Sequence, residues 1–225
     1  DVMRRSSDKW IVDFGWTMTE QEASFYAAPF AHIVTNVRPI REKNNRAAYA
    51  KEWWRHVEPR PGMHRALKGL NRFIVTPEVS KHRVFEWMKP PVLPDHKLQV
   101  ICRDDDCSFG VLQSRFHEVW ALRVGSWHGV GNDPRYTVGS CFGTFPFPEG
   151  LTPNSPAAAY AADPRAQAIA TAAADLVAKR DAWLNPPELI RVVPEVVSGF
   201  PDRILPRDDA AAAVLKKRTL TALYN

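Results

Sequence analysis

The spacing of hydrophobic residues divides the middle of the chain into short strands and one helix. Short β-branched or apolar runs at Arg72–Thr76, Val84–Trp87 and Leu98–Cys102 are separated by proline and charged residues, which predicts strands. Across Phe109–Val124, hydrophobic residues recur at intervals of three and four, which predicts one amphipathic helix. Its buried stripe would consist of Phe109, Leu112, Phe116, Val119, Trp120 and Val124.

The N-terminal third is predicted to be mainly helical. The apolar run Trp10–Phe14 indicates a short strand. Thr19 followed by Glu22 is a capping-box pattern and predicts that a helix begins there. The composition of Arg41–Val57 predicts a longer helix, which ends before two prolines.

After the central helix, glycines and prolines predict irregular structure. Residues 125–134 hold three glycines and an Asn-Asp-Pro sequence, as in an adaptable loop, and Tyr136–Val138 and Ser140–Phe142 could form short strands. A Pro/Ala/Ser linker leads to an Ala-rich helix at Arg165–Leu184, and Asp208 is a candidate N-cap for another helix that ends near Tyr224. Five prolines between these helices predict an irregular chain.

Together these elements predict an α+β fold. We expect a small mixed, largely antiparallel sheet with flanking helices, followed by a loosely attached helical C-terminal extension. The change of composition at Glu149 predicts a division into residues 1–148 and 149–225. The chain begins without Met and stops just after a helical pattern, so we expect a truncated piece of a longer polypeptide.

Charge adds a candidate partner to this picture. The chain has 30 Lys and Arg against 25 Asp and Glu, but Arg38–Arg83 holds twelve basic residues against four acidic ones. Trp53, Trp54 and Phe73 are interleaved with them. Such a segment favours a polyanion such as DNA, and the alternative is a solvated face of a basic protein, with the tryptophans in the core.

Sequence motifs exclude several classes of function. Three cysteines without a CxxC pair indicate neither a disulfide framework nor a zinc site and fit a reducing cytoplasm, and no apolar run approaches membrane-spanning length. Asp104–Asp106 could bind a divalent cation, but a solvated turn before a helix is the simpler interpretation. Asn185–Glu188 has a glutamate where the loop of amino-methyltransferases has an aromatic residue. No catalytic or metal site is therefore predicted.

Five separate segments, in order and at consistent spacing, resemble the MmeI-like proteins. These are single-chain type IIG/IIL restriction–modification enzymes with nuclease, adenine methyltransferase and target-recognition parts. The matching segments are VSKHRVF (79–85), LPD (93–95), FGVLQSRFHEVWALR (109–123), GVGNDPRYT (129–137) and CFGTFPFP (141–148). One departure is Gly143, where the family tends to carry Glu.

The resemblance implies that residues 1–148 are a target-recognition domain for double-stranded DNA in restriction–modification or phage defence. The S-adenosylmethionine site and catalytic loop would belong to an upstream methyltransferase domain of the same polypeptide, with Mg²⁺ involved if a nuclease domain is present. No cofactor is expected in the present chain, and the whole protein is expected to be cytoplasmic.

Side chains that could contact DNA come from three segments. Arginine forks can bind guanine or phosphate, histidine and serine can bond to base edges, and clustered basic residues can position the backbone. The candidates are Lys81, His82, Arg83, Arg115, His117, Arg123, Ser126, Trp127, His128 and Arg135. Of these, Arg123 to His128 are the preferred base readers.

Several of these residues also have structural interpretations. Arg115 could form a helix pair with Glu118, His117 could serve at a surface or domain contact, and Arg135 could brace the loop through carbonyls or Asp133. For the chain as a whole, the second hypothesis is a protein–protein docking module of a defence complex. A self-contained enzyme is less favoured, because no nucleophile and base occur in a recognisable pattern.

Overall fold

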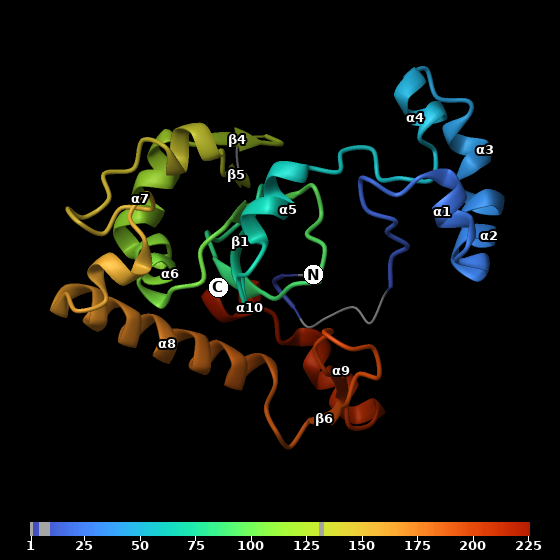
Figure 1. Ribbon diagram of the computed structural model, residues 1–225. Coiled ribbons are helices and arrows are strands. Elements are labelled where there is room, and N and C mark those ends of the chain that lie inside the picture. The colour runs from blue at the N-terminus through green and yellow to red at the C-terminus, as the bar shows by residue number, and fades with distance from the viewer. Residues whose placement is uncertain (1, 5–9, 131–132) are drawn as a thin grey trace. The chain divides into compact units, whose positions relative to one another are not determined.

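The computed structural model describes residues 2–4, 10–130 and 133–225 (Figure 1). Contacts within the chain divide it into two compact units, each described here by itself. Residues 10–66 form the smaller unit, and residues 67–225 together with 2–4 form the larger one. The chain passes from one unit to the other near the end of α5 (Pro61–Leu67).

The smaller unit consists of short helices around a few aromatic residues. Its helices include α1 (Glu20–Ser24), α2 (Ala27–Asn36), α3 (Arg38–Arg41) and α4 (Ala47–Lys51). The buried core residues are Phe14, Ala23, Ile33 and Trp53. The burial of Trp53 agrees with a core role for the tryptophans.

Two predictions for this unit need correction, and one is confirmed. The Thr19–Glu22 capping box is present, with both of its reciprocal hydrogen bonds. Trp10–Phe14 is irregular rather than a strand. The helix predicted at Arg41–Val57 is interrupted, because the side chain of Asn44 accepts a hydrogen bond from the backbone of Arg46 and forms a turn (2.9 Å).

The larger unit contains a three-stranded antiparallel sheet with the order β2-β1-β3. The central strand β1 (Phe73–Pro77) pairs with β2 (Glu86–Met88) and with β3 (Leu98–Ile101). The structure thus confirms the predicted strands to within two residues. Ile74 of β1 packs with Phe85 and with Phe109 of the following helix, so the core lies between sheet and helices. The α+β fold is confirmed.

The predicted helix at 109–124 is in fact two helices that meet at Ser114. Helix α6 (Asp106–Gln113) ends there and α7 (Arg115–Val124) begins. Ser114 has an extended backbone (ψ 152°), and its hydroxyl donates to Val111 O and accepts from the amide of His117. This double cap changes the direction of the chain, so the predicted stripe is buried in α6 but not in α7.

A short hairpin follows α7 where a loop was predicted. Strands β4 (Ser126–His128) and β5 (Asp133–Arg135) pair antiparallel, and Figure 1 shows them beyond the end of α7. Neither strand predicted after the hairpin is present, because Tyr136 and Thr137 are irregular and residues 138–142 form the π-helix η1 (Val138–Phe142). Gly125 allows the close turn between α7 and β4, since a Cβ there would lie 2.6 Å from the carbonyl oxygen of Ala121.

The C-terminal region packs closely on the sheet unit and is not the loosely attached tail that we predicted. The predicted Ala-rich helix is α8 (Pro164–Leu184), preceded by the short 3₁₀-helix η2 (Ala157–Tyr160), and it lies directly against α6. A Cβ on Gly110 of α6 would stand 2.6 Å from a methyl carbon of Ile169, so glycine allows this approach. Arg180 of α8 is buried and donates to Phe85 O (2.8 Å) and to the Glu86 carboxylate (3.0 Å).

The proline-rich segment after α8 is more regular than expected. Its strands β6 (Ile190–Val193) and β7 (Arg203–Pro206) form an antiparallel hairpin. Asp208 caps the next helix, α9 (Asp209–Lys217), as predicted, and α10 (Leu220–Tyr224) follows as a separate helix.

Candidate nucleic-acid interface

His117 lies in the core and supports the interface instead of forming part of it. Its side chain is fully buried, and Nδ1 is 2.8 Å from Leu112 O. Because a carbonyl only accepts, Nδ1 carries the proton and Nε2 accepts from the hydroxyl of Tyr136 (3.2 Å). Burial lowers the pKa of His117 to about 4, so the ring is neutral at pH 7. The predicted contact between His117 and DNA is corrected, since this side chain does not reach the surface.

Arg83 is a second candidate that the structure places in the interior. Its guanidinium donates to Thr76 Oγ1 (2.9 Å) and to two backbone carbonyls, those of Pro77 (2.5 Å) and Pro134 (3.2 Å). It also lies 5.0 Å from the centre of the Tyr136 ring. Burial lowers its pKa to about 10, which still leaves it charged at neutral pH. Arg83 therefore joins the end of β1 to β5, and its assignment as a phosphate contact is corrected.

Arg135 braces the hairpin, though not through the partners considered from the sequence. Its Nε and Nη2 lie 2.7 and 2.6 Å from one carboxylate oxygen of Glu78, just after β1. Lys97 lies 3.6 Å from the other oxygen of the same carboxylate. These contacts hold β5 against the sheet and leave the Arg135 side chain 40% exposed.

The outer face of α7 carries both charged and apolar side chains. Arg115 is exposed and forms the ion pair with Glu118 that its spacing predicted (2.5 Å). Phe116 is 84% exposed and Val119 is 52% exposed, so both lie outside the core where the predicted stripe had placed them. Arg123 is exposed at the C-terminal end, and its side chain bonds to no residue in the described parts of the chain.

The adjoining hairpin continues this exposed surface. Ser126, Trp127 and His128 are all exposed, with Trp127 at 49%. Because side chains alternate along a strand, Ser126 and His128 share one face and Trp127 lies on the other. Val130 at the tip is 97% exposed, while Gly131 and Asn132 lie outside the described residues. We call Phe116, Val119, Arg123 and residues 126–128 the reader surface.

Lys81 and His82 lie outside the reader surface as defined. Both contact the side chain of Asn225, with its amide oxygen 2.6 Å from Lys81 Nζ and 3.0 Å from His82 Nε2. Lys81 remains exposed and His82 is half-buried. The candidates therefore divide into exposed residues, the partly exposed His82 and Arg135, and two buried supports, Arg83 and His117.

Asp104–Asp106 serve the start of α6, in agreement with the simpler interpretation of this run. Asp105 caps the helix by accepting from the Ser108 amide (2.8 Å), and Asp106 pairs with Arg72. Burial raises the pKa of Asp105, but hydrogen bonds from Ser108 and the charge of Arg103 outweigh it and lower the pKa overall. Among the residues described, no group of three or more His, Cys, Asp or Glu could hold a metal ion.

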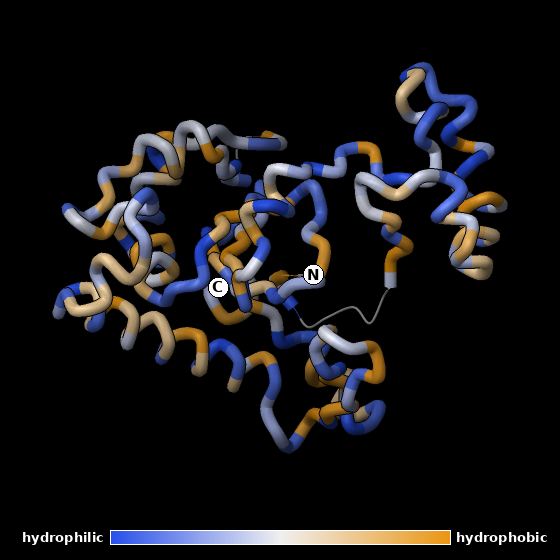
Figure 2. Tube along the Cα trace, in the orientation of Figure 1, coloured by the Kyte–Doolittle hydropathy of each residue, from blue (hydrophilic) through white to orange (hydrophobic). Residues whose placement is uncertain are grey.

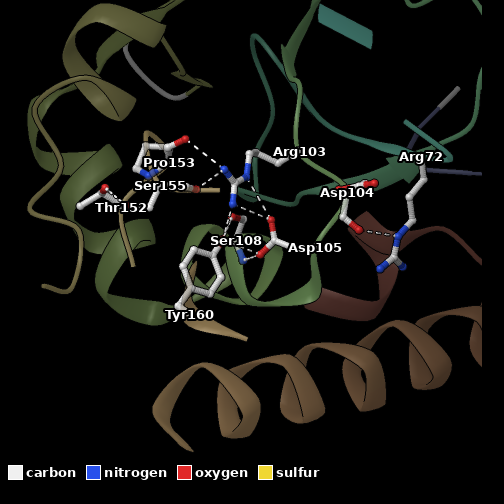
Figure 3. Close-up of polar contacts among 9 residues, drawn as sticks. All are labelled: Arg72, Arg103, Asp104, Asp105, Ser108, Thr152, Pro153, Ser155 and Tyr160. Carbon is white, nitrogen blue, oxygen red and sulfur yellow. Dashed lines mark hydrogen bonds and ion pairs between the residues drawn. The ribbon is translucent and has the colours of Figure 1, made fainter. Parts of the chain in front are cut away.

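Arg103 fastens the segment that precedes η2 to the start of α6 (Figure 3). Its guanidinium bonds to Asp105 and donates to the carbonyls of Pro153 (3.1 Å) and Ser155 (2.7 Å). It also contacts the hydroxyl of Tyr160, which donates to Asp105 (3.0 Å). Every polar group in this cluster therefore has a partner, which indicates a structural clamp.

Sequence reasoning missed the exposed apolar part of the reader surface. Phe116 and Val119 follow the hydrophobic period of Phe109 and Leu112, so the pattern alone placed them in the core. The signal that could have corrected this is Ser114, a residue that favours helix N-caps in the middle of the run. A second helix that begins at Ser114 has its own direction, so its apolar residues need not lie on the buried face of the first helix.

Comparison with known proteins identifies a matching family. The family model for the MmeI target recognition domain matches residues 8–149, which is more than half of the chain. No curated protein and no solved structure matches the chain. Within the described residues, no helix has both the length and the hydropathy needed to cross a membrane. The family's role is sequence-specific DNA recognition in an MmeI-like restriction–modification system. The chain belongs to the MmeI target recognition domain family.

Proposed function

We propose that this chain reads a specific duplex sequence for an N6-adenine DNA methyltransferase of a restriction–modification or phage-defence system. The observation that carries the proposal is the exposed guanidinium of Arg123, which has no side-chain partner in the described structure and stands beside the hairpin. An arginine with a free fork can bond to both O6 and N7 of one guanine. An arginine held by a carboxylate, such as Arg135, has fewer donors to offer a base.

The other exposed residues would complete the reading. Ser126 and His128, on one face of β4, can donate to or accept from base edges in the major groove. The apolar side chains Phe116 and Val119 suit contact with a thymine methyl group. Trp127, on the opposite face of β4, could pack on the sugar–phosphate backbone.

Phosphate positioning would fall to basic residues outside the base-reading set. Lys81 and His82 suit this task, and so does Arg115, which forms an ion pair with Glu118. Arg83, His117 and Arg135 would act only by fixing the sheet, helix and hairpin that carry the readers.

Methyl transfer would take place in a domain upstream of this chain. That domain would bind S-adenosylmethionine and flip the target adenine, and Mg²⁺ would be needed only by a nuclease domain. In this proposal the present chain only binds DNA and carries out no chemical step. We also propose that the protein is cytoplasmic. Methyl transfer by the isolated chain in the presence of S-adenosylmethionine would contradict this division.

The test is selection of duplexes from a randomised pool, followed by affinity measurements on the selected sequence. We expect a clear preference, and we expect Arg123→Ala to relax it at one base pair by about 1–3 kcal/mol. Lys81→Ala should weaken binding to all duplexes alike. Arg191→Ala, on exposed strand β6, removes the same side chain elsewhere and should change neither property.

The result that would refute the proposal is equally specific. If Arg123→Ala and Lys81→Ala had the same effect on every duplex, the separation of readers from phosphate contacts would be wrong. The exposed Phe116, Val119 and Val130 also suit a protein partner, as the docking hypothesis requires. A flat salt response with no preference among duplexes would favour that hypothesis over DNA recognition.

A further inference from the structure

The smaller unit has a concentration of unbalanced positive charge between α3 and α4. Residues 41–51 (REKNNRAAYAK) contain four basic residues and one acidic residue, Glu42. Glu42 is already neutralised by Arg38, whose Nε lies 2.7 Å from its carboxylate. The hydropathy colouring shows a hydrophilic tract through this turn (Figure 2). We call Arg41, Lys43, Arg46 and Lys51 the basic turn.

Two arginines of the basic turn are arranged around one tyrosine. The guanidinium carbons of Arg41 and Arg46 lie 5.5 and 5.3 Å from the centre of the Tyr49 ring. Arg46 also donates to the Tyr49 hydroxyl (2.7 Å), and the Asn44 turn fixes its backbone. Both arginines therefore contact an aromatic ring, and Arg46 also bonds to a neutral hydroxyl, without a carboxylate.

The arrangement leaves positive charge without a compensating partner in the described residues. Nη1 of Arg41 is shielded from solvent and has no hydrogen-bond partner in the described structure. No ion pair joins Arg41, Lys43, Arg46 or Lys51 to a described carboxylate, whereas nearby Arg38, Arg55 and Arg60 are each paired with a glutamate. Like charges held around one ring repel each other, and a bound anion would relieve that repulsion.

We propose that the basic turn binds phosphates of the DNA backbone and anchors the duplex independently of its sequence. The ligand follows from the proposed function, because a duplex supplies phosphates at a spacing that several cations can share. Arginine forks and lysine ammonium groups are the side chains that contact phosphate oxygens, and such contacts position a protein without reading bases. The basic turn thus contributes affinity, while the reader surface contributes choice of sequence.

The experiment compares two variants of equal charge, using the whole chain. Lys43→Gln/Arg46→Gln removes two positive charges from the basic turn, and Lys216→Gln/Lys217→Gln removes two exposed ones from α9. The Kd for the selected duplex and for a scrambled duplex is measured from 50 to 300 mM KCl, an interval of about sixfold in salt. Circular dichroism melting verifies that each variant folds.

The association constant K falls as salt rises, so the slope of log K against log salt is negative. Neutralising the basic turn should reduce the magnitude of this slope by about two, since each lost phosphate contact contributes about 0.9. The ratio of selected to scrambled affinity should stay unchanged, and so should the slope of the α9 variant. An unchanged slope in the basic-turn variant would overturn the proposal, and so would an equal fall in both variants. If the double variant failed to fold, Lys43→Glu alone should still lower affinity for both duplexes.

These outcomes separate the inference from the proposed function. If the wild-type chain showed no sequence preference but the slope fell as expected, the anchor would stand and the proposed reading would fail. If the preference were clear but the slope did not change, the reading would stand and the anchor would fail. Titration with inorganic phosphate would reveal a simple ion site if millimolar phosphate displaced the duplex only from the wild type.

Discussion

Gly110→Ala should weaken the packing between α6 and α8, although alanine is the better helix former. The new Cβ would stand 2.6 Å from Ile169 Cγ2, 3.0 Å from the Ile169 carbonyl oxygen and 3.2 Å from Ala173 Cβ. The first neighbour belongs to a β-branched side chain with little rotameric freedom, and the second belongs to the backbone of α8. Relief of the contact therefore requires movement of α8 itself.

Two opposing effects set the magnitude of this change. Overpacking of this kind costs about 1–3 kcal/mol. Replacing a glycine inside a helix by alanine gains about 1 kcal/mol. The difference of these two effects is a fall in the free energy of unfolding of up to about 2 kcal/mol, which lowers the melting temperature by up to about 8 °C in a chain of this size.

Calorimetry of the purified chain measures this effect, and Gly139→Ala is the matched control. A Cβ at Gly139 would meet no atom within 4 Å, so alanine there should be neutral or slightly stabilising. Ile169→Ala removes the closest methyl group, and the double variant should be about 1 kcal/mol more stable than the sum of the single effects predicts. If Gly110→Ala were as stable as Gly139→Ala, the close approach of α6 and α8 would be refuted.

Three further predictions concern buried or braced side chains of the larger unit. The pKa of His117 falls from 6.5 to about 4 on folding, so the unfolded chain binds more protons between these values and stability is lost as the pH falls. His117→Phe should remove about 2–3 kcal/mol of the difference in unfolding free energy between pH 7 and 4.5, and an unchanged difference would contradict the burial of a neutral ring. Tyr160→Phe should lower the free energy of unfolding by about 1–3 kcal/mol, because Asp105 loses a hydrogen-bond donor. Amide hydrogen exchange should become faster at residues 152–156. Exchange as slow as in the wild type would argue against a structural role for the cluster of Arg103, Asp105 and Tyr160. Glu78→Gln should weaken the partly exposed ion pair with Arg135 by about 0.5–1 kcal/mol, and amide hydrogen exchange in β5 should become faster. If exchange changed only in other parts of the chain, this ion pair would not be what holds β5.

Features that depend on neighbours in sequence were predictable. The Thr19–Glu22 capping box and the Asp208 cap follow from side chains that bond to their own helix ends. The three strands of the sheet were recognised because β-branched runs between prolines leave few alternatives. The five motif segments identified the family, and with it the role in DNA recognition.

Features that depend on distant partners were not predictable. His117 is polar, and its burial becomes favourable only because Tyr136 and Leu112 satisfy both ring nitrogens. Arg83 is likewise buried against carbonyls that include Pro134, 51 residues further along the chain. A pattern of spacing carries no information about such pairs. The hairpin β6–β7 was missed because its prolines lie near strand ends, where they do not interrupt pairing.

The serine between α6 and α7 separates two kinds of evolutionary constraint. Residues of α6 are held by packing, so changes there affect whether the domain folds. Arg123, Ser126 and His128 lie on the solvent side of that junction, where substitutions usually alter stability by less than about 0.5 kcal/mol. If these residues read bases as proposed, such a chain could exchange the side chains that choose its target while its stability stays almost constant. New specificities would then be accessible by single substitutions, without compensating changes in the core.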